Sequence, residues 1–399
     1  MLARAMALGY TIEPVVDLPA LEGRIVRLHT PRQLGTGEAL ADLAHRFPQG
    51  DFVANLVYRH YETAEAASGG WTAKATAPAS GAPCERDRCF GHTVIHWKER
   101  LAACATGLRI GVIDTAVDLS HSAFRHHRPV VRDFAPAATE RSMDHGTAVV
   151  SLLAGDPSGA TPGLVPDAAI FAANVFYREA DGGLTADTMS IVAALDWLAS
   201  QGVRIVNMSY AGPADPLVEA AIEDMRRLGT VFVAAAGNNG PNAEPVFPAA
   251  YPGVIAVTAV SSDLSGYRHA NRGSYIDVAA PGVGIWTALP GGMAGYQTGT
   301  SFAAPYVTAI LAVDARLIGV GEPKADLLAR IEIRDLGKPG QDPVYGRGLL
   351  LAPQSCEAPG MVALPGGWSP MRSMFGASLA DEGATLGGIG FGFVKPARR

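Results

Sequence analysis

Three polar residues could together activate a serine nucleophile: Asp114, His145 and Ser301. A serine hydroxyl is a poor nucleophile until a base removes its proton. That base needs a carboxylate to fix its tautomer and to stabilise the imidazolium. The three residues occur in the order Asp, His, Ser, one of the chain orders in which such triads are found. The sequence therefore predicts covalent catalysis with Asp114 as orienting group, His145 as general acid and base, and Ser301 as nucleophile.

Each of these residues has a plainer explanation when it is considered alone. Asp114 directly follows the apolar run 108–113, so it could cap a turn or a helix. His145 precedes Gly-Thr and an apolar helical run, so it could be a capping histidine. Ser301 lies in the string GTSFAAP at residues 299–305, where a helix cap explains the serine but not the string. The combination and the order favour catalysis.

A fourth segment, at the end of the apolar run 230–235, contains Asn238 in the string AAAGNNGP. A side-chain amide beside a nucleophile would stabilise the oxyanion of a tetrahedral intermediate, which is the largest effect in such catalysis. A turn formed by Asn-Gly is the alternative explanation. The presence of the other three segments favours the oxyanion function for Asn238.

Short apolar runs that alternate with helical segments must position these side chains. Because the runs are apolar throughout, they predict a parallel sheet with both faces covered by helices. The runs are residues 108–113, 169–173, 203–207, 230–235 and 254–258, and the helical segments include 188–200, 216–228 and an apolar helix from Ser301 to Val313.

The composition excludes several other classes of protein. The 399 residues are 48% hydrophobic and carry a formal net charge of −6, with no dense basic run, so we expect no nucleic-acid partner. No apolar stretch reaches the length of about 18 residues that a membrane span needs. Four cysteines, Cys84, Cys89, Cys104 and Cys356, fit no common zinc spacing and leave disulfides and free thiols equally open. We expect no metal and no cofactor.

Taken together, these motifs resemble those of the subtilase family of serine peptidases. The similar segments cover roughly residues 105–352, and they are VIDT at 112–115, HGT at 145–147, GLVPDAAI at 163–170, NMS at 207–209, AAGN at 235–238, YPGVIAV at 251–257, APG at 280–282 and GTS at 299–301. The resemblance implies a subtilisin-like three-layer α/β fold with a mostly parallel central sheet. It also implies the functions given above for Asp114, His145, Ser301 and Asn238, and a serine endopeptidase that acts on proteins or peptides.

The resemblance further implies a substrate cleft, in which the backbone around Gly183 and near residues 209–212 would pair with an extended substrate. Residues 235–237 would wall the pocket for the side chain before the scissile bond. The predicted substrate-binding residues are Gly183, Ser209, Tyr210, Ala211, Gly212, Ala235, Ala236 and Gly237.

The sequence departs from the family at four places, where Ala116, Ala148, Phe302 and Ala211 replace the usual Gly, His, Met and Gly. None of these removes a catalytic group, whereas Ala211 adds a methyl group to a backbone that faces substrate. The family's calcium loop is not evident, because the segment 155–161 has one carboxylate.

We divide the chain into a small α+β unit that resembles a pro-segment (1–61), a linker rich in Ala, Gly, Ser, Thr and Pro (62–95), a catalytic domain (96–353) and a Gly-rich tail of unassigned function (354–399). The N-terminal unit could be an inhibitor removed by cleavage or a permanent accessory domain. The family resemblance implies a secreted or periplasmic protein, whereas the first residues contain no clear signal peptide, so a cytoplasmic location stays open. A catalytically silent binding or scaffold protein is the alternative to an enzyme.

Overall fold

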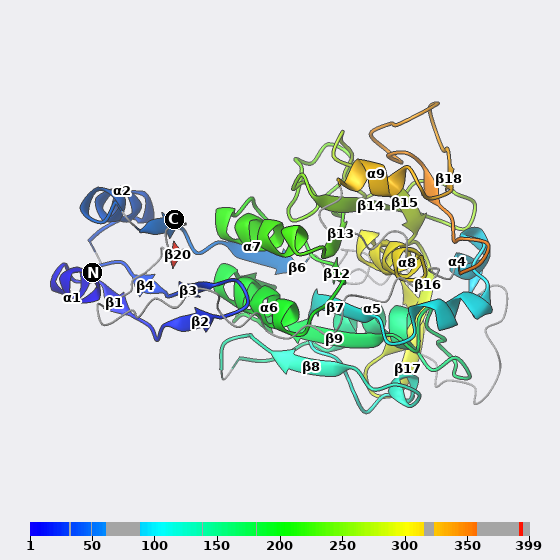
Figure 1. The fold of residues 1–399 in the computed structure, drawn as a ribbon, viewed down its shortest axis with the longest axis horizontal. Coiled ribbons are helices and arrows are strands. Elements are labelled where there is room, and N and C mark those ends of the chain that lie inside the picture. The colour runs from blue at the N-terminus through cyan, green and yellow to red at the C-terminus, as the bar shows by residue number, and fades with distance from the viewer. Residues whose placement is uncertain are drawn as a thin grey trace, which may run out of the picture.

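A nine-stranded sheet forms the centre of the molecule (Figure 1). The structure is a computed structural model, and it describes residues 1–31, 33–48, 50–60, 88–137, 139–180, 182–314, 323–356 and 391–393. Neighbouring strands are parallel except for the pair β18 and β19 at one edge. The strands, in spatial order, are β18 (Ile333–Arg334), β19 (Leu349–Leu350), β15 (Val278–Pro281), β14 (Val254–Val260), β13 (Val231–Ala235), β12 (Ile205–Met208), β7 (Arg109–Asp114), β9 (Ala169–Asn174) and β8 (Val130–Asp133).

Helices cover both faces of this sheet and create two separate cores. α5 (Asp144–Ala154) and α8 (Thr300–Ala312) pack against each other on one face. α6 (Thr188–Ser200) and α7 (Pro216–Arg227) pack on the other face, which Figure 1 shows in green, across the strands from the yellow α8. The central strands are mostly apolar, as expected of strands whose two faces are both buried. The predicted three-layer α/β fold is therefore confirmed.

Residues 1–60 form a unit at one end of the molecule, drawn in blue in Figure 1. Its own core is small and consists of Ala5, Tyr10, Leu28, Ala39, Leu43 and Phe47. Its elements are α1 (Leu2–Ala7), β1 (Thr11–Ile12), β2 (Val16–Leu18), β3 (Gly23–Ile25), β4 (Leu28–His29), α2 (Thr36–Arg46), β5 (Asp51–Val53) and β6 (Val57–His60). In the tail, β20 (Phe391–Phe393) pairs with β5.

β6 leaves this unit and joins residues 96–356, which we call the catalytic body. It pairs antiparallel with β11 (Leu184–Asp187), which also pairs with β10 (Tyr177–Arg178). On the other side of the body, the hairpin of β16 (Ile285–Leu289) and β17 (Met293–Gln297) packs against α5. Two short helices, η2 (Ser122–Phe124) and α9 (Lys324–Leu328), also belong to this body.

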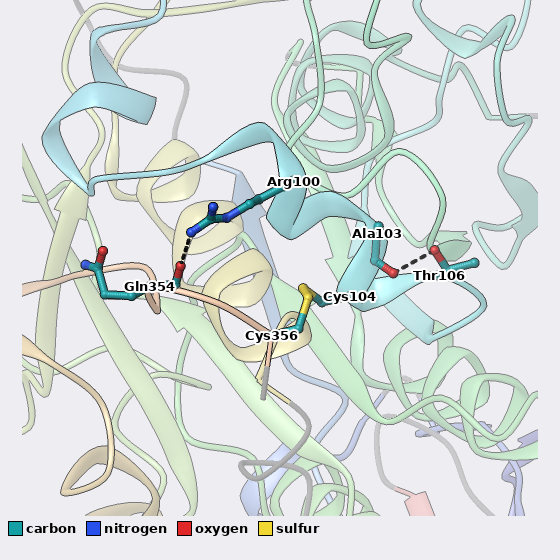
Figure 2. The surroundings of a disulfide bond; sticks show 6 residues. All are labelled: Arg100, Ala103, Cys104, Thr106, Gln354 and Cys356. Carbon is teal, nitrogen blue, oxygen red and sulfur yellow. Dashed lines mark hydrogen bonds between the residues drawn. A yellow bond between two sulfur atoms is a disulfide. The ribbon is translucent and has the colours of Figure 1, made fainter. Parts of the chain in front are cut away.

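The segment that precedes β7 is joined to the end of the catalytic body by a disulfide between Cys104 and Cys356, which Figure 2 shows. Beside this disulfide, Arg100 donates a hydrogen bond of 2.7 Å to the Gln354 carbonyl oxygen. Cys89 is also disulfide-bonded, whereas Cys84 lies outside the described residues.

This segment contains α4 (Phe90–Val94) and η1 (Glu99–Ala105), and it packs on the catalytic body. Ile95 is fully buried there, and its carbonyl oxygen accepts a hydrogen bond of 2.8 Å from the Ala352 amide. Within the predicted linker, residues 88–95 therefore pack with the catalytic body. No helix among the described residues has both the length and the apolarity to cross a membrane.

Candidate active site

The candidate catalytic residues lie at one edge of the central sheet, where parallel strands end. β7 ends at Asp114, Ser209 directly follows β12, and Asn238 follows the end of β13. The carboxyl ends of parallel strands meet at the same edge, which is where open α/β sheets place their functional sites. The topology thus gathers residues that are far apart in the sequence.

Asp114 and His145 form a short hydrogen bond, with 2.7 Å between Asp114 Oδ1 and His145 Nδ1. The same carboxylate oxygen accepts a bond of 2.7 Å from the Thr115 amide. Asp114 is 2% exposed, and the His145 side chain is 10% exposed. A carboxylate buried and held in this way fixes the proton of the imidazole on Nδ1 and leaves Nε2 to act as the base.

Thr115 positions the start of α5, although the sequence did not indicate this function. Its hydroxyl accepts a hydrogen bond of 2.7 Å from the Gly146 amide. A methyl group on Gly146 would lie 2.3 Å from the Thr115 carbonyl oxygen, so a glycine is needed for the helix to come this close. Asp144 lies inside the first turn of α5, where its carboxylate accepts a hydrogen bond of 3.0 Å from the Ser142 hydroxyl, and Met143 occupies the cap position.

Ser301 lies in the first turn of α8 and is 6% exposed. The next residue, Phe302, packs its ring against His145, with 5.0 Å between the ring centroids. The packing of α8 on α5 therefore places the residue next to Ser301 in contact with His145.

Asn238 is held against the start of α8 by its side-chain oxygen. Asn238 Oδ1 accepts hydrogen bonds of 3.0 Å from both the amide and the hydroxyl of Thr300. Thr300 in turn accepts a bond of 3.1 Å from the Gly237 amide. Because its oxygen is engaged, the Asn238 side chain presents its NH₂ group as the available donor. Thr300 is a second residue whose function the sequence did not indicate.

A small cavity lies between these elements. Its lining consists of Ser209, Tyr210, Ala211, Ala235, Gly237, Asn238, Thr300 and Ser301. Five of the eight predicted substrate-binding residues are in this lining. Ala236 is not, because its side chain is fully buried in the sheet.

The other two predicted substrate-binding residues lie nearby. The Gly212 amide donates 2.8 Å to the Phe247 carbonyl oxygen, and the Phe247 amide donates 2.9 Å to the Gly212 carbonyl oxygen. The backbone of Gly212 is therefore already paired. Gly183 lies between β10 and β11, where its carbonyl oxygen accepts from the Glu179 amide.

Tyr58 of β6 fills a fully buried position next to this cavity. Its ring packs edge-on against Tyr210, with 5.8 Å between the centroids. A methyl group on Gly212 would lie 2.2 Å from Tyr58 Cδ1, so only glycine leaves room for the ring. Burial raises the pKa of the Tyr58 phenol well above its ordinary value, and the carboxylate of Asp215 adds to this shift. Burial also raises the pKa of Asp215.

Comparison with known proteins agrees with this geometry. The profile of the subtilase family matches residues 105–318. Subtilisin E of Bacillus subtilis (strain 168) is 32% identical over 216 residues, which are 52% of this chain and 55% of that protein. The major intracellular serine protease of the same organism is 33% identical over 220 residues, 52% of this chain and 67% of that protein. The chain spans about half the length of the first curated relatives that it matches.

Solved structures show the same architecture. Fervidolysin from Fervidobacterium pennivorans, described as a keratinolytic enzyme related to subtilisin, superposes with a TM-score of 0.58 at 23% identity, covering 75% of this chain and 50% of that one. The prenylagaramide maturation protease PagA superposes with a TM-score of 0.53 at 26% identity, covering 63% and 94%. The profile match covers more than half of the sequence and coincides with the sheet that carries the site. The chain belongs to the subtilase family.

Proposed function

We propose that this protein is a serine endopeptidase that cleaves peptide bonds through an acyl-enzyme intermediate on Ser301. His145 removes the proton from the Ser301 hydroxyl as it attacks and returns it to the leaving amine. Asp114 holds the imidazole in the correct tautomer and stabilises the imidazolium that forms. Water then releases the acyl group by the same steps in reverse.

The observation that carries this proposal is the bond of 2.7 Å between Asp114 and His145, made beside Phe302, the residue that follows Ser301. The side chain of Asn238 supports it, because the bonds from Thr300 occupy the oxygen and leave the NH₂ group as donor. The Ser301 amide is in the first turn of α8, where no helical carbonyl can accept from it. These two donors would stabilise the oxyanion of the tetrahedral intermediate.

The test is to incubate the purified protein with casein, with and without a serine-directed fluorophosphonate. We expect cleavage within the casein chains, complete inhibition by the reagent and a covalent label on Ser301. A protein that folds but neither cleaves casein nor takes up the label would be a silent scaffold. Cleavage of small esters without cleavage of casein would indicate an esterase.

We also propose that residues 1–61 act as an internal inhibitor that is removed by cleavage. An extended peptide that binds a protease adds a strand to an exposed sheet edge, with side chains in pockets. β6 pairs with β11 in this way, over four residue pairs from Val57 with Asp187 to His60 with Leu184. Tyr58 lies buried beside Tyr210, which also lines the cavity at Ser301. This arrangement favours a strand bound in the manner of a product.

Further contacts between the unit and the body support this proposal. Asp196 of α6 accepts hydrogen bonds of 2.8 and 3.0 Å from the amides of Ala20 and Leu21. Arg27 forms an ion pair with the buried carboxylate of Asp187. The linker that follows β6 would let the unit leave after cleavage.

Mass spectrometry of the wild type and of the Ser301→Ala variant, expressed side by side, tests this second proposal. We expect the wild type to begin between Tyr61 and Arg88 and the variant to keep residue 1. An active wild type that retains residue 1 would instead make the unit a permanent accessory domain.

We propose an oxidising location, either secreted or periplasmic. The disulfide between Cys104 and Cys356, together with the bonded Cys89, supports this, because disulfides are rare in a reducing cytoplasm. Thiol labelling of the native protein in cell fractions tests it. We expect no label on Cys104 or Cys356 without prior reduction, and labelling in the cytoplasmic fraction would contradict the proposal.

A further inference from the structure

The helix that carries the proposed nucleophile contains an irregularity one turn after Ser301. In an α-helix each N–H donates to the carbonyl four residues earlier, and for residue 305 that carbonyl belongs to Ser301. Residue 305 is a proline inside α8, so it has no N–H to donate. Ser301 is 6% exposed, and a buried carbonyl that lacks a donor is costly. The carbonyl of Ser301 therefore needs a donor from outside its helix.

Ser209 supplies this donor. Its hydroxyl donates a hydrogen bond of 2.8 Å to the Ser301 carbonyl oxygen. Ser209 directly follows the central strand β12 and is 1% exposed. The bond therefore joins the peptide unit of Ser301 to the buried end of a central strand.

Two further residues fix the direction of this bond. Asn207 Nδ2 donates 2.9 Å to Ser209 Oγ, and Thr308 Oγ1 donates 3.1 Å to Asn207 Oδ1. Asn207 and Thr308 are both fully buried. Since Ser209 Oγ accepts from Asn207, its own proton is left to point toward Ser301. Thr308 lies on α8, so the chain of three bonds starts and ends on the same helix and holds it at two points over β12.

We propose that Ser209 is a positioning residue for Ser301, oriented by Asn207 and Thr308. The function that we assign to Ser209 rests on the proposed peptidase activity. The carbonyl of Ser301 is rigidly connected to the Cα atom that carries its reactive hydroxyl. A tilt of that peptide unit therefore moves Oγ relative to His145 and Asn238, and a small misplacement of a nucleophile slows the reaction strongly. The hydroxyl of Ser209 is engaged with Ser301 and is not a ligand for substrate.

A cycle of Ser209→Ala, Pro305→Ala and the double variant tests this proposal. Ser209→Ala removes the external donor, and we expect kcat to fall about tenfold with KM changed less than about twofold. Pro305→Ala supplies a helical N–H for the same carbonyl. We therefore expect the double variant to recover most of the lost kcat, a departure from additivity that two independent sites would not show.

Two further variants separate positioning from a general loss of stability. Thr230→Val removes a buried hydroxyl that donates a hydrogen bond of 3.1 Å to the Val203 carbonyl oxygen. Thr230 directly precedes β13, at the end of that strand opposite to the site, so this substitution should leave kcat unchanged. Thr308→Val removes the far end of the hydrogen-bonded chain and should lower kcat about threefold, less than Ser209→Ala does. An equal loss of kcat in Thr230→Val and Ser209→Ala would overturn the proposal.

The same cycle measured in the Ser301→Ala background does not depend on activity, because the carbonyl of residue 301 is retained. We expect Ser209→Ala to lower the melting temperature by about 3 °C, and Pro305→Ala to cancel most of that loss. Independent effects of the two substitutions on unfolding would overturn the positioning proposal, even if the wild type cleaves casein. A wild type that shows this coupling but cleaves nothing would overturn the peptidase function instead.

Discussion

The catalytic body and the N-terminal unit are held together in different ways. The body has two large cores on either side of a nine-stranded sheet, and buried hydrogen bonds connect its site to both α5 and α8. The N-terminal unit has a core of only six buried residues. It contributes Leu18, Leu21, Ile25 and Tyr58 to a core of the body. A small core depends on external contacts for its order. We therefore expect the body to be stable on its own and the unit to depend on its contacts with the body.

The largest effect should come from the triad itself. Ser301→Ala and His145→Ala should each lower kcat about 10⁶-fold, the magnitude known for the relative subtilisin, and neither should change the unfolding temperature much. Assays on casein with freshly purified protein measure this effect. Retention of more than a few per cent of activity in Ser301→Ala would show that another residue is the nucleophile.

Asn238→Ala should lower kcat by about 10²- to 10³-fold with KM almost unchanged, a magnitude that again comes from subtilisin. The amide meets the oxyanion only in the transition state, so substrate binding should not change. Steady-state kinetics on a peptide substrate separate the two parameters. A raised KM with an intact kcat would make Asn238 a residue that binds the ground state.

The contact between the two regions can be weakened at Tyr58, a fully buried side chain of β6. Tyr58→Ala should lower the affinity of the cleaved unit for the body about 100-fold, because the burial of the ring contributes about 3 kcal/mol. The measurement is the lag before activity appears after refolding, which should shorten. Val57→Ala is the matched control, since Val57 is 44% exposed on the same strand. Equal lags in both variants would mean that β6 does not restrain the enzyme.

Stability should also depend on pH through His92 of α4, the helix that packs on the body. Burial against Tyr306 lowers the pKa of His92 from 6.5 to about 4. Between these two pH values His92 is protonated in the unfolded chain but not in the folded chain. The free energy of unfolding should therefore fall as the pH drops from about 6.5 to about 4. The loss should be at most about 3 kcal/mol. Denaturant unfolding at a series of pH values measures it, and His92→Phe should flatten this part of the profile.

The sequence predicted most of the body, because its elements follow from local patterns. The helix expected at 188–200 has these bounds in the structure, and the strands expected at 108–113 and 169–173 lie at 109–114 and 169–174. The triad segments were equally readable, since each has a distinctive string at a strand end or helix start. In these regions the local pattern of apolar and polar residues is sufficient to predict the secondary structure.

Long-range pairing and hydrogen bonding could not be predicted in this way. Residues 51–60 contain two separate strands, β5 and β6, because β6 pairs with β11 far along the chain. The positions of Thr115, Thr300 and Ser209 in the site depend on how α5 and α8 pack over the sheet. Local sequence patterns do not predict that packing.

The seam between residues 95–104 and 351–356 has a consequence for self-digestion, since a peptidase of the kind we propose would also meet other molecules of its own kind. Proteases attack chains at frayed ends, where the backbone can unfold locally and enter a cleft. Here the disulfide between Cys104 and Cys356 and the backbone bond from Ala352 to Ile95 fasten both ends of the body to each other. If the N-terminal unit is removed as we propose, this seam would still join residues 95–104 to residues 351–356, and we expect the resistance of the body to self-digestion to depend on the disulfide.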